Sequence, residues 1–330
     1  MLVVQSFGKE TEYRRAILTI QSYYVHCIPR EAGQTYLFTD DPSYFQKFLI
    51  ERPIRFFYIS PEKIKNMRGD IDFLHRMKIA IIEESFLASN ENLLYADSDT
   101  FFTSDPSPLM NEVNEHVSFM HLCEYRFDSL LKIGLPAGAP FHAFVKCILE
   151  NKFLMPDGSA LKVMLDQYSW NAGVMMLDRA ILKLLPEVYA LTDYFLKPTQ
   201  NHASEQYAFS VILQNSTDVR SCDKVIYHYW YRVKKEIMDQ FLSEEITLKW
   251  SELTEEKKET MIKEWTKVLP SHIDNHILML RDNAIQSFHE NKFKEGYWFA
   301  AKAIAKKPFS LTFAMDVLFH TKRWIRKRIH

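Results

Sequence analysis

The chain has 330 residues, 47% of them apolar and 14% aromatic, and its formal net charge is −1. This composition excludes a disordered chain and predicts one large domain with an appendage, or two domains. A net charge so close to zero gives no reason to expect nucleic-acid binding. The four cysteines are far apart and form no Cys-x-x-Cys pair. They therefore indicate free thiols in a reducing compartment, not a zinc site or a disulfide framework.

The sequence has no recognisable targeting or membrane-spanning segment. The first ten residues, MLVVQSFGKE, reach a lysine and a glutamate after too few apolar residues for a signal peptide. No uncharged run approaches the ~20 residues that are needed to span a bilayer. We therefore expect a cytoplasmic protein.

The first part of the chain alternates between strand and helix patterns. Short apolar runs typical of strands occur at residues 2–7, 35–41, 54–60 and 93–102. Residues 11–26 and 73–88 instead carry apolar side chains at helical spacing. This alternation predicts an α/β fold with a mostly parallel sheet and helices on its faces. In such sheets ligands bind beyond the carboxyl ends of the strands, and two of the apolar runs place acidic residues there.

Two Asp-x-Asp sequences occur in this region. Asp70 and Asp72 precede a helical pattern, and we interpret them as caps of that helix. Asp97 and Asp99 follow the apolar strand LLYA, and residues two apart in a strand point to the same side. Two such carboxylates need a cation or several donors to neutralise them. The alternative for this second sequence is a solvated loop with one aspartate in a turn.

The residue types at this strand end suit a divalent cation. Two carboxylates, completed by waters and substrate phosphates, are the usual way in which proteins hold Mg²⁺ or Mn²⁺. A nucleoside diphosphate leaving group fits such a site, since the metal would neutralise its developing charge. His228 ends a distant apolar run and precedes the basic residues Arg232, Lys234 and Lys235, so it is a candidate third ligand. The alternative is a structural histidine.

Several segments, taken together in order, resemble a known enzyme family. They are FLHRMKIAIIEESF, LLYADSDTFFTSDPSPL, YSWNAGVMMLD, SEQYAFSVIL and VIYHYW. This set resembles the GT-A-fold nucleotide-sugar glycosyltransferases, closest to the glycosyltransferase family 8-like group. The resemblance implies a GT-A-type catalytic domain over residues 1–235, with residues 236–330 forming an all-helical C-terminal region.

The resemblance also implies a site. It assigns Asp97 and Asp99 to the metal and the donor, and His228 to the metal. It further implies donor contacts by Tyr13, Asp40, Arg76 and Lys234, and a reaction centre with Asn171, Glu205 and Gln206. The implied cofactor is Mn²⁺ or Mg²⁺ and the implied donor a UDP-sugar, with retention of the anomeric configuration. We expect the acceptor to be a glycan or a lipid-linked sugar, the latter if the C-terminal tail contacts a membrane.

Three positions depart from the family pattern. Tyr231 and Lys235 stand where the family often has Gly and Pro after the histidine, and Glu205 stands where it has Asp. Some family-like residues also have structural interpretations: Arg76 as a surface residue, Gln206 as a polar residue on a helix face, and the WNAGV segment as a turn.

The last hundred residues have a helical pattern. Residues 275–308 resemble one tetratricopeptide-type helical hairpin, with small residues at Ala284, Gly296, Ala300 and Ala303. The tail interleaves apolar residues with Lys322, Arg323, Arg326, Lys327 and Arg328. Two interpretations of the tail stay open. One is an interfacial helix that makes peripheral contact with an anionic membrane. The other is a solvated C-terminal helix.

Two other functions compete with the glycosyltransferase interpretation. A haloacid-dehalogenase-type phosphohydrolase would use Asp97 as nucleophile, but its motif usually continues Gly-Thr, whereas Thr100 and Phe101 follow here. A covalent aspartyl-phosphate would support it. A non-catalytic sugar-nucleotide-binding protein of the same fold would keep the site without turnover, and hydrolysis of the donor would separate it from an enzyme.

Overall fold

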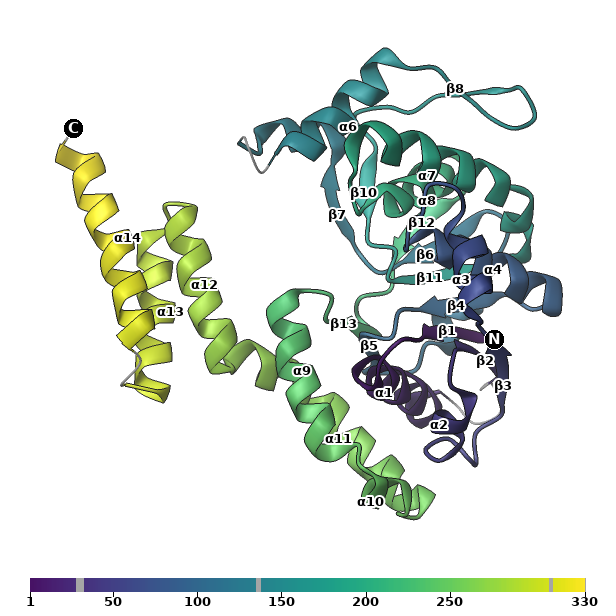
Figure 1. Cartoon of the computed structure of the whole chain (residues 1–330), viewed down its shortest axis with the longest axis horizontal. Coiled ribbons are helices and arrows are strands. Elements are labelled where there is room, and N and C mark those ends of the chain that lie inside the picture. The colour runs from purple at the N-terminus through teal and green to yellow at the C-terminus, as the bar shows by residue number, and fades with distance from the viewer. Residues whose placement is uncertain (28–32, 135–137, 309–310, 330) are drawn as a thin grey trace.

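A seven-stranded sheet organises the first two thirds of the protein (Figure 1). The computed structural model describes residues 1–27, 33–134, 138–308 and 311–329, with side chains up to residue 325. In sheet order the strands are β12 (Asp218–Ser221), β6 (Val117–Met120), β11 (Val174–Leu177), β4 (Leu93–Ala96), β1 (Leu2–Ser6), β2 (Thr35–Thr39) and β3 (Ile54–Tyr58). β11 is antiparallel to both neighbours, and the other pairs are parallel. The predicted mostly parallel α/β sheet is confirmed.

Helices cover both faces of this sheet. They are α1 (Glu10–His26), α2 (Pro42–Gln46), α3 (Pro61–Arg68), α4 (Arg76–Ala88), α5 (Ser107–Met110), α6 (Ala139–Glu150), α7 (Leu185–Thr199) and α8 (Ser204–Ser216), with 3₁₀ turns at Phe127–Lys132 and Arg179–Lys183. Because strand side chains alternate, Val3 belongs to a core that includes residues of α4, α7 and α8, whereas Leu2 and Val4 belong to a core with α1 on the other face. Each face therefore has its own apolar core.

Three short antiparallel pairs lie outside the main sheet. They are β5 (Thr100–Phe102) with β13 (Ile226–His228), β7 (Cys123–Arg126) with β10 (Tyr168–Trp170), and β8 (Phe153–Leu154) with β9 (Ala160–Leu161). The β5–β13 pair brings the end of the α/β region back to the residues that follow β4. This pairing positions the candidate site.

Two sequence interpretations are wrong in their local structure. The run 93–102 is not one strand, because β4 ends at Ala96 and a turn precedes β5, so strand alternation does not align Asp97 with Asp99. Asp70 and Asp72 do not cap a helix either. They lie in a turn before α4, where Asp72 has φ 49° and its carboxylate lies 2.9 Å from Nε of Arg68. Aspartate tolerates this left-handed conformation better than most residues.

The C-terminal helices belong to two different cores. They are α9 (Arg232–Glu245), α10 (Leu248–Ser251), α11 (Glu255–Asn275), α12 (Ile277–His289), α13 (Phe293–Lys306) and α14 (Leu311–Ile329). α9 to α11 pack with α1 in the core of one sheet face, so residue 235, the predicted end of the first domain, lies inside α9. α12 and α13 pack against each other and share a small separate core with α14.

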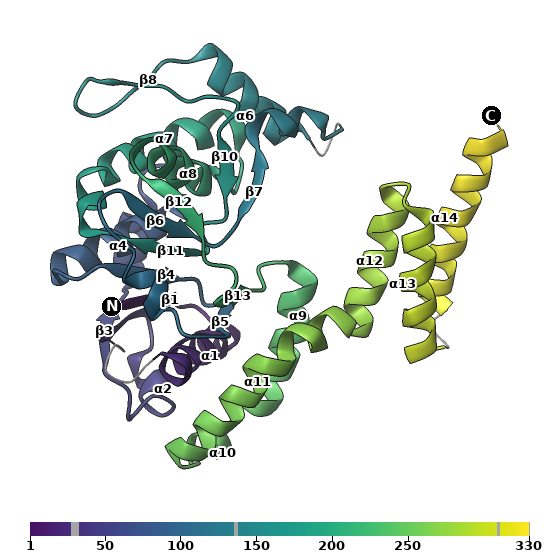
Figure 2. The same ribbon diagram turned by 180° about the vertical axis from the view of Figure 1, so that it is seen from behind.

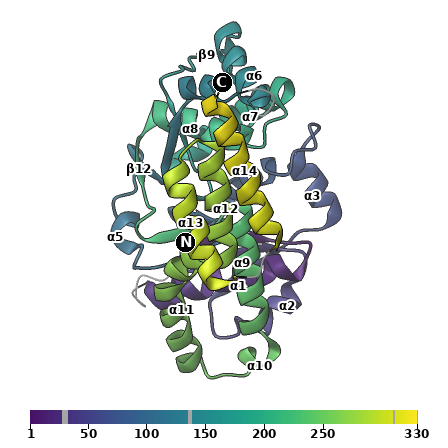
Figure 3. The same cartoon turned by 90° about the vertical axis from the view of Figure 1, so that its left-hand side faces the viewer.

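The hairpin and α14 extend away from the sheet. Figures 1 and 2 show α12 to α14 as a separate group connected through α9 and α11, and Figure 3 shows the three helices lying side by side. Ala284, Ala300 and Ala303 are buried in the core that these helices share. Among the described helices, none combines the length and the apolar character needed to cross a membrane.

Candidate active site

The turn between β4 and β5 lies at the carboxyl edge of the sheet and carries Asp97 and Asp99. The N–H of Asp97 donates to the carbonyl of Gly173 (2.8 Å), and the Thr100 hydroxyl donates to the carbonyl of Asp97 (2.9 Å). These bonds fix the turn. His228, the last residue of β13, lies opposite Thr100. The two carboxylates and the imidazole thus offer three ligand atoms within 4.8 Å of one another.

The imidazole of His228 is buried and oriented by Asn171. Its Nδ1 lies 2.9 Å from Oδ1 of Asn171, which also accepts a hydrogen bond from the N–H of Gly173 (3.0 Å). In its neutral form the imidazole donates from Nδ1 to this oxygen, which leaves the lone pair on Nε2 free for a metal ion. Nε2 has no hydrogen-bond partner among the described residues and lies 3.4 Å from Oδ1 of Asp99. A bare imidazole nitrogen facing a carboxylate fits a divalent cation.

Asp99 is almost fully buried, and two basic side chains compensate its charge. Burial raises the pKa of its carboxyl, but the attraction to His228 and Lys235 outweighs burial and holds the pKa well below its usual range. Nζ of Lys235 lies 2.6 Å from Oδ2 of Asp99. The carboxylate is therefore charged at neutral pH.

A fully buried lysine that our sequence reasoning missed lies next to Asp97. Nζ of Lys78 donates to the carbonyl of Ala172 (2.9 Å) and lies 3.4 Å from Oδ2 of Asp97 and 3.5 Å from Oε1 of Glu205. The Tyr95 hydroxyl donates to the other oxygen of Asp97 (2.6 Å). Burial lowers the pKa of Lys78, but the two carboxylates outweigh it and the pKa is raised. Lys78 is therefore a cation at neutral pH.

Arg76 and Lys234 point elsewhere. The Nε of Arg76 lies 3.2 Å from Oδ1 of Asp193, and its guanidinium lies over the ring of Tyr189. Lys234 donates to the hydroxyl of Tyr227 (2.9 Å). No ion pair or hydrogen bond recorded among the described residues joins either side chain to the aspartates of the turn. Lys78 and Lys235 are the cationic side chains that the structure brings to those aspartates.

Asn171 and Gln206 converge on Glu124, a second residue that sequence reasoning missed. The amide of Gln206 donates to Glu124 (2.8 Å) and to the Ser169 hydroxyl (2.8 Å), and its oxygen accepts from the N–H of Ala172 (3.3 Å). The amide of Asn171 donates to the other oxygen of Glu124 (3.1 Å). Glu124 thus links the first turn of α8 to the residue that orients the imidazole.

Glu205, next to Gln206 in α8, is buried and faces Lys78. Burial raises the pKa of its carboxyl from 4.5 to about 7, opposed by Lys78 and reinforced by Asp97. A group with this pKa exchanges a proton near neutral pH, which is the property of a general acid or base.

We expect Glu205 to make stability depend on pH. Between pH 4.5 and 7 the folded protein holds a proton that the unfolded chain has released, so a stabilising contribution present below pH 4.5 is lost as the pH rises through 7. Glu205→Gln cannot titrate. Between pH 4.5 and 8, the free energy of unfolding of wild type relative to this variant should therefore fall by roughly 3 kcal/mol. Urea unfolding at both pH values measures it, and a constant difference would contradict the raised pKa.

Tyr13 and Asp40 lie together at the same edge of the sheet. The Tyr13 hydroxyl donates to Asp40 (2.8 Å), and the second oxygen of Asp40 accepts from the N–H of Gly8 (2.9 Å). Ser98, between the two aspartates of the turn, donates to Glu12 in the first turn of α1 (3.0 Å). This hydrogen bond holds the first turn of α1 against the turn that carries Asp97 and Asp99. Tyr13 follows Glu12 directly in sequence.

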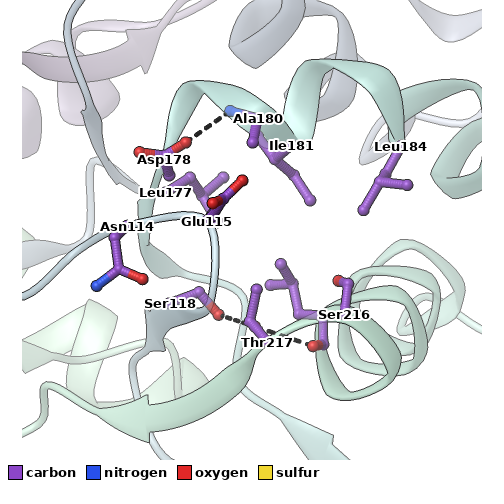
Figure 4. A pocket seen from close by; sticks show the side chains of 11 residues that line it. Asn114, Glu115, Ser118, Leu177, Asp178, Ala180, Ile181, Leu184, Ser216 and Thr217 are labelled. Atoms are coloured by element: carbon purple, nitrogen blue, oxygen red, sulfur yellow. Dashed lines mark hydrogen bonds between the residues drawn. The ribbon is translucent and has the colours of Figure 1, made fainter.

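A small cavity lies at the opposite edge of the sheet (Figure 4). Its volume is about 50 Å³, and its walls include Ser118, Leu177, Ile181, Leu184 and Thr217. Leu177 pairs with Leu93 at the start of β4, whereas Asp97 follows the end of that strand. Pockets for small-molecule ligands are usually ~300–1,000 Å³, so this cavity is too small for a nucleotide sugar.

No protein-family model and no curated protein sequence matches this chain. Among solved structures, the chain is similar to mouse xyloside xylosyltransferase 1 in its apo form, with 14% identity, 67% of this chain and 84% of that chain covered, and a TM-score of 0.44. It is also similar to the galactosyltransferase LgtC in complex with donor and acceptor sugar analogues, with 12% identity, 66% and 73% covered, and a TM-score of 0.43.

A third similar structure is the glycosyltransferase GlyE of Streptococcus pneumoniae TIGR4, with 12% identity and a TM-score of 0.46. The match covers 81% of this chain and 63% of GlyE. At these identities and scores the likeness assigns neither a family nor an activity. The α/β architecture rests on the sheet topology itself.

Proposed function

We propose that this protein is a metal-dependent glycosyltransferase that moves a sugar from a nucleotide-sugar donor, a UDP-hexose, to an acceptor. The observation that carries the proposal is the convergence of Asp97, Asp99 and the unpartnered Nε2 of His228 within 4.8 Å at the carboxyl edge of the sheet. The ordered sequence motifs that resemble family 8-like glycosyltransferases support it. Together they favour sugar transfer over other uses of an acidic site.

Asp97, Asp99 and His228 would hold Mn²⁺ or Mg²⁺, which when bound neutralises the charge of a leaving diphosphate. The other residues prepare this site. Asn171 holds the imidazole with Nε2 toward Asp99, and Lys78 compensates the charge of the partly buried Asp97. In such a reaction the bond between the anomeric carbon and the diphosphate oxygen breaks, a bond from that carbon to an acceptor hydroxyl oxygen forms, and the hydroxyl proton passes to the departing diphosphate. Protein groups contribute positioning and electrostatic stabilisation.

The donor contacts are a further part of the proposal. We place the nucleoside near Tyr13 and Asp40, where the Asp40 carboxylate can accept a hydrogen bond from a ligand hydroxyl. We assign Lys78, in place of Arg76, to the donor side of the site, because its ammonium lies between Asp97 and Glu205. Lys234 stays a predicted phosphate contact that would require its side chain to leave Tyr227.

The stereochemistry and the acceptor stay predictions. Retention would need a group near the anomeric carbon, and Glu205, Gln206 and backbone carbonyls of this region are the candidates. The acceptor is predicted to be a glycan or a lipid-linked sugar. Peripheral membrane contact also stays a prediction, for which the exposed Leu318, Phe319, Lys322 and Arg323 of α14 are the candidate residues. The predicted basic residues at 326–328 lie beyond the described side chains. The phosphohydrolase and the non-catalytic binder gain no specific support.

A thermal-shift panel of nucleotide sugars with and without Mn²⁺ tests the proposal. A donor at 100 times its Kd stabilises the folded state by about 2.7 kcal/mol, so the correct donor should raise Tm by about 5 °C when Mn²⁺ is present. The same donor without a divalent metal should give a much smaller shift. Mn²⁺-dependent release of UDP from the selected donor would then separate an enzyme from a binder. Absence of any shift across the panel would contradict the proposal.

A further inference from the structure

Lys235 contacts the candidate metal site from the first turn of α9. Its Nζ lies 2.6 Å from Oδ2 of Asp99, and its side chain is about one third exposed. The helix that carries it is fixed, because Arg15 of α1 forms two hydrogen bonds with Asp239 of α9, at 2.6 Å and 2.5 Å. The backbone at Lys235 is therefore held in place, while its long side chain has access to solvent.

The carboxylate of Asp99 is engaged on both oxygens. Oδ1 faces Nε2 of His228 at 3.4 Å, and Oδ2 holds the Lys235 ammonium at 2.6 Å. A divalent cation bound by Asp99 and His228 would lie within a few ångströms of this ammonium, and two positive charges at that distance repel strongly in a buried site. While Oδ2 is paired with the ammonium, it is also a weaker ligand for a metal ion. The two cations therefore exclude or weaken each other.

We propose that Lys235 is a built-in competitor of the divalent cation at Asp99. In the metal-free protein its ammonium neutralises the buried carboxylate, and metal binding displaces it toward solvent. Lysine suits this exchange because its ammonium sits on a flexible, partly exposed stem and forms no rigid two-pronged contact. The inference rests on the metal site of the proposed function, but it concerns a residue that departs from the family pattern.

Binding of Mn²⁺ in the absence of nucleotide tests the competition directly. The signal of free Mn²⁺ in electron paramagnetic resonance is titrated against wild type, K235M, K235R and K234M. K235M removes the competing charge and should bind Mn²⁺ about tenfold more tightly than wild type. K235R keeps the charge and should bind about as weakly as wild type. K234M is the matched control, since Lys234 is the adjacent lysine but contacts Tyr227 instead of Asp99.

The outcomes separate this inference from the proposed function. Equal Mn²⁺ affinity of wild type and K235M would overturn the competition and leave the metal site standing. Absence of Mn²⁺ binding by every variant would overturn both. Tighter binding by K234M to the same degree as by K235M would show a general charge effect and would also overturn the inference. If K235M does not fold, K235Q removes the same charge with a polar side chain and gives the same test.

Discussion

Replacing Asp99 by alanine should lower kcat/KM for sugar transfer by roughly 10³-fold, the scale of losing one electrostatic group of a preorganised site. Asp99 is almost fully buried, and its carboxylate contacts both His228 and Lys235. Without it, the imidazole nitrogen and Asp97 would be too few protein ligands to fix the cation against the diphosphate. The measurement is the initial rate of UDP release at saturating Mn²⁺ with the donor selected by thermal shift.

The other Asp-x-Asp sequence gives a matched control for Asp99→Ala. Asp70 is exposed in the turn before α4, so Asp70→Ala removes an aspartate from the same type of sequence without touching the site. Its kcat/KM should stay close to that of wild type. Thermal unfolding of both variants shows whether a lost rate reflects a lost fold. An Asp99→Ala protein that folds and retains metal-dependent transfer would remove the metal assignment.

The fold was largely predictable because its signals are local. Strand-like apolar runs and helical spacing identified β1 to β4 and the helices α1 and α4, since each element buries a face whose period is visible in sequence. The turn at Asp97 was not predictable in this way. It depends on the hydrogen bond from the Asp97 N–H to Gly173, a residue 76 positions away in the chain. Long-range contacts of this kind leave no local pattern.

The same contrast between local patterns and long-range contacts explains which residues of the candidate site were predicted from the sequence. Asp97, Asp99 and His228 were predicted as ligands because they end apolar runs, and the structure brings their side chains close together. Lys78 was missed, although its position between the buried Met77 and Ile79 in a helix could have indicated an ammonium turned toward the core. Glu124 offered no such signal, because it lies in a short strand whose pairing with β10 is visible only in three dimensions.

Arg76 and Lys78 show why helix position alone did not identify the basic residue that lies next to Asp97. The two residues are two apart, so they lie about 200° apart around a helix of 3.6 residues per turn and face nearly opposite directions. The structure turns Lys78 toward β4 and Arg76 toward Asp193 in α7. The resemblance pointed to this helix, and the apolar stripe of the helix identifies which basic residue faces the sheet.

Gly173→Ala should abolish the orientation of His228 while leaving every candidate ligand in the sequence. A Cβ at Gly173 would lie 2.0 Å from Cε1, 2.5 Å from Nδ1 and 2.7 Å from Nε2 of the imidazole, closer than real Cβ contacts come. The ring must move, which breaks its hydrogen bond to Asn171. We expect Mn²⁺ affinity to fall by about 10–100-fold, as for loss of a group that orients a ligand. Stability should fall by about 1–3 kcal/mol, as for overpacking.

A double-mutant cycle identifies the imidazole as the cause. If the ring is what the new methyl group meets, adding Gly173→Ala to His228→Ala should lower stability far less than adding it to wild type, because the clashing ring is gone. Gly33→Ala is the control, since a Cβ there comes no closer than 3.6 Å to any described residue beyond its immediate neighbours in sequence. Urea unfolding and Mn²⁺ titration of these variants give both readouts. Wild-type Mn²⁺ affinity in Gly173→Ala would mean that the position of this imidazole does not matter to the metal, and His228 would then not be a ligand.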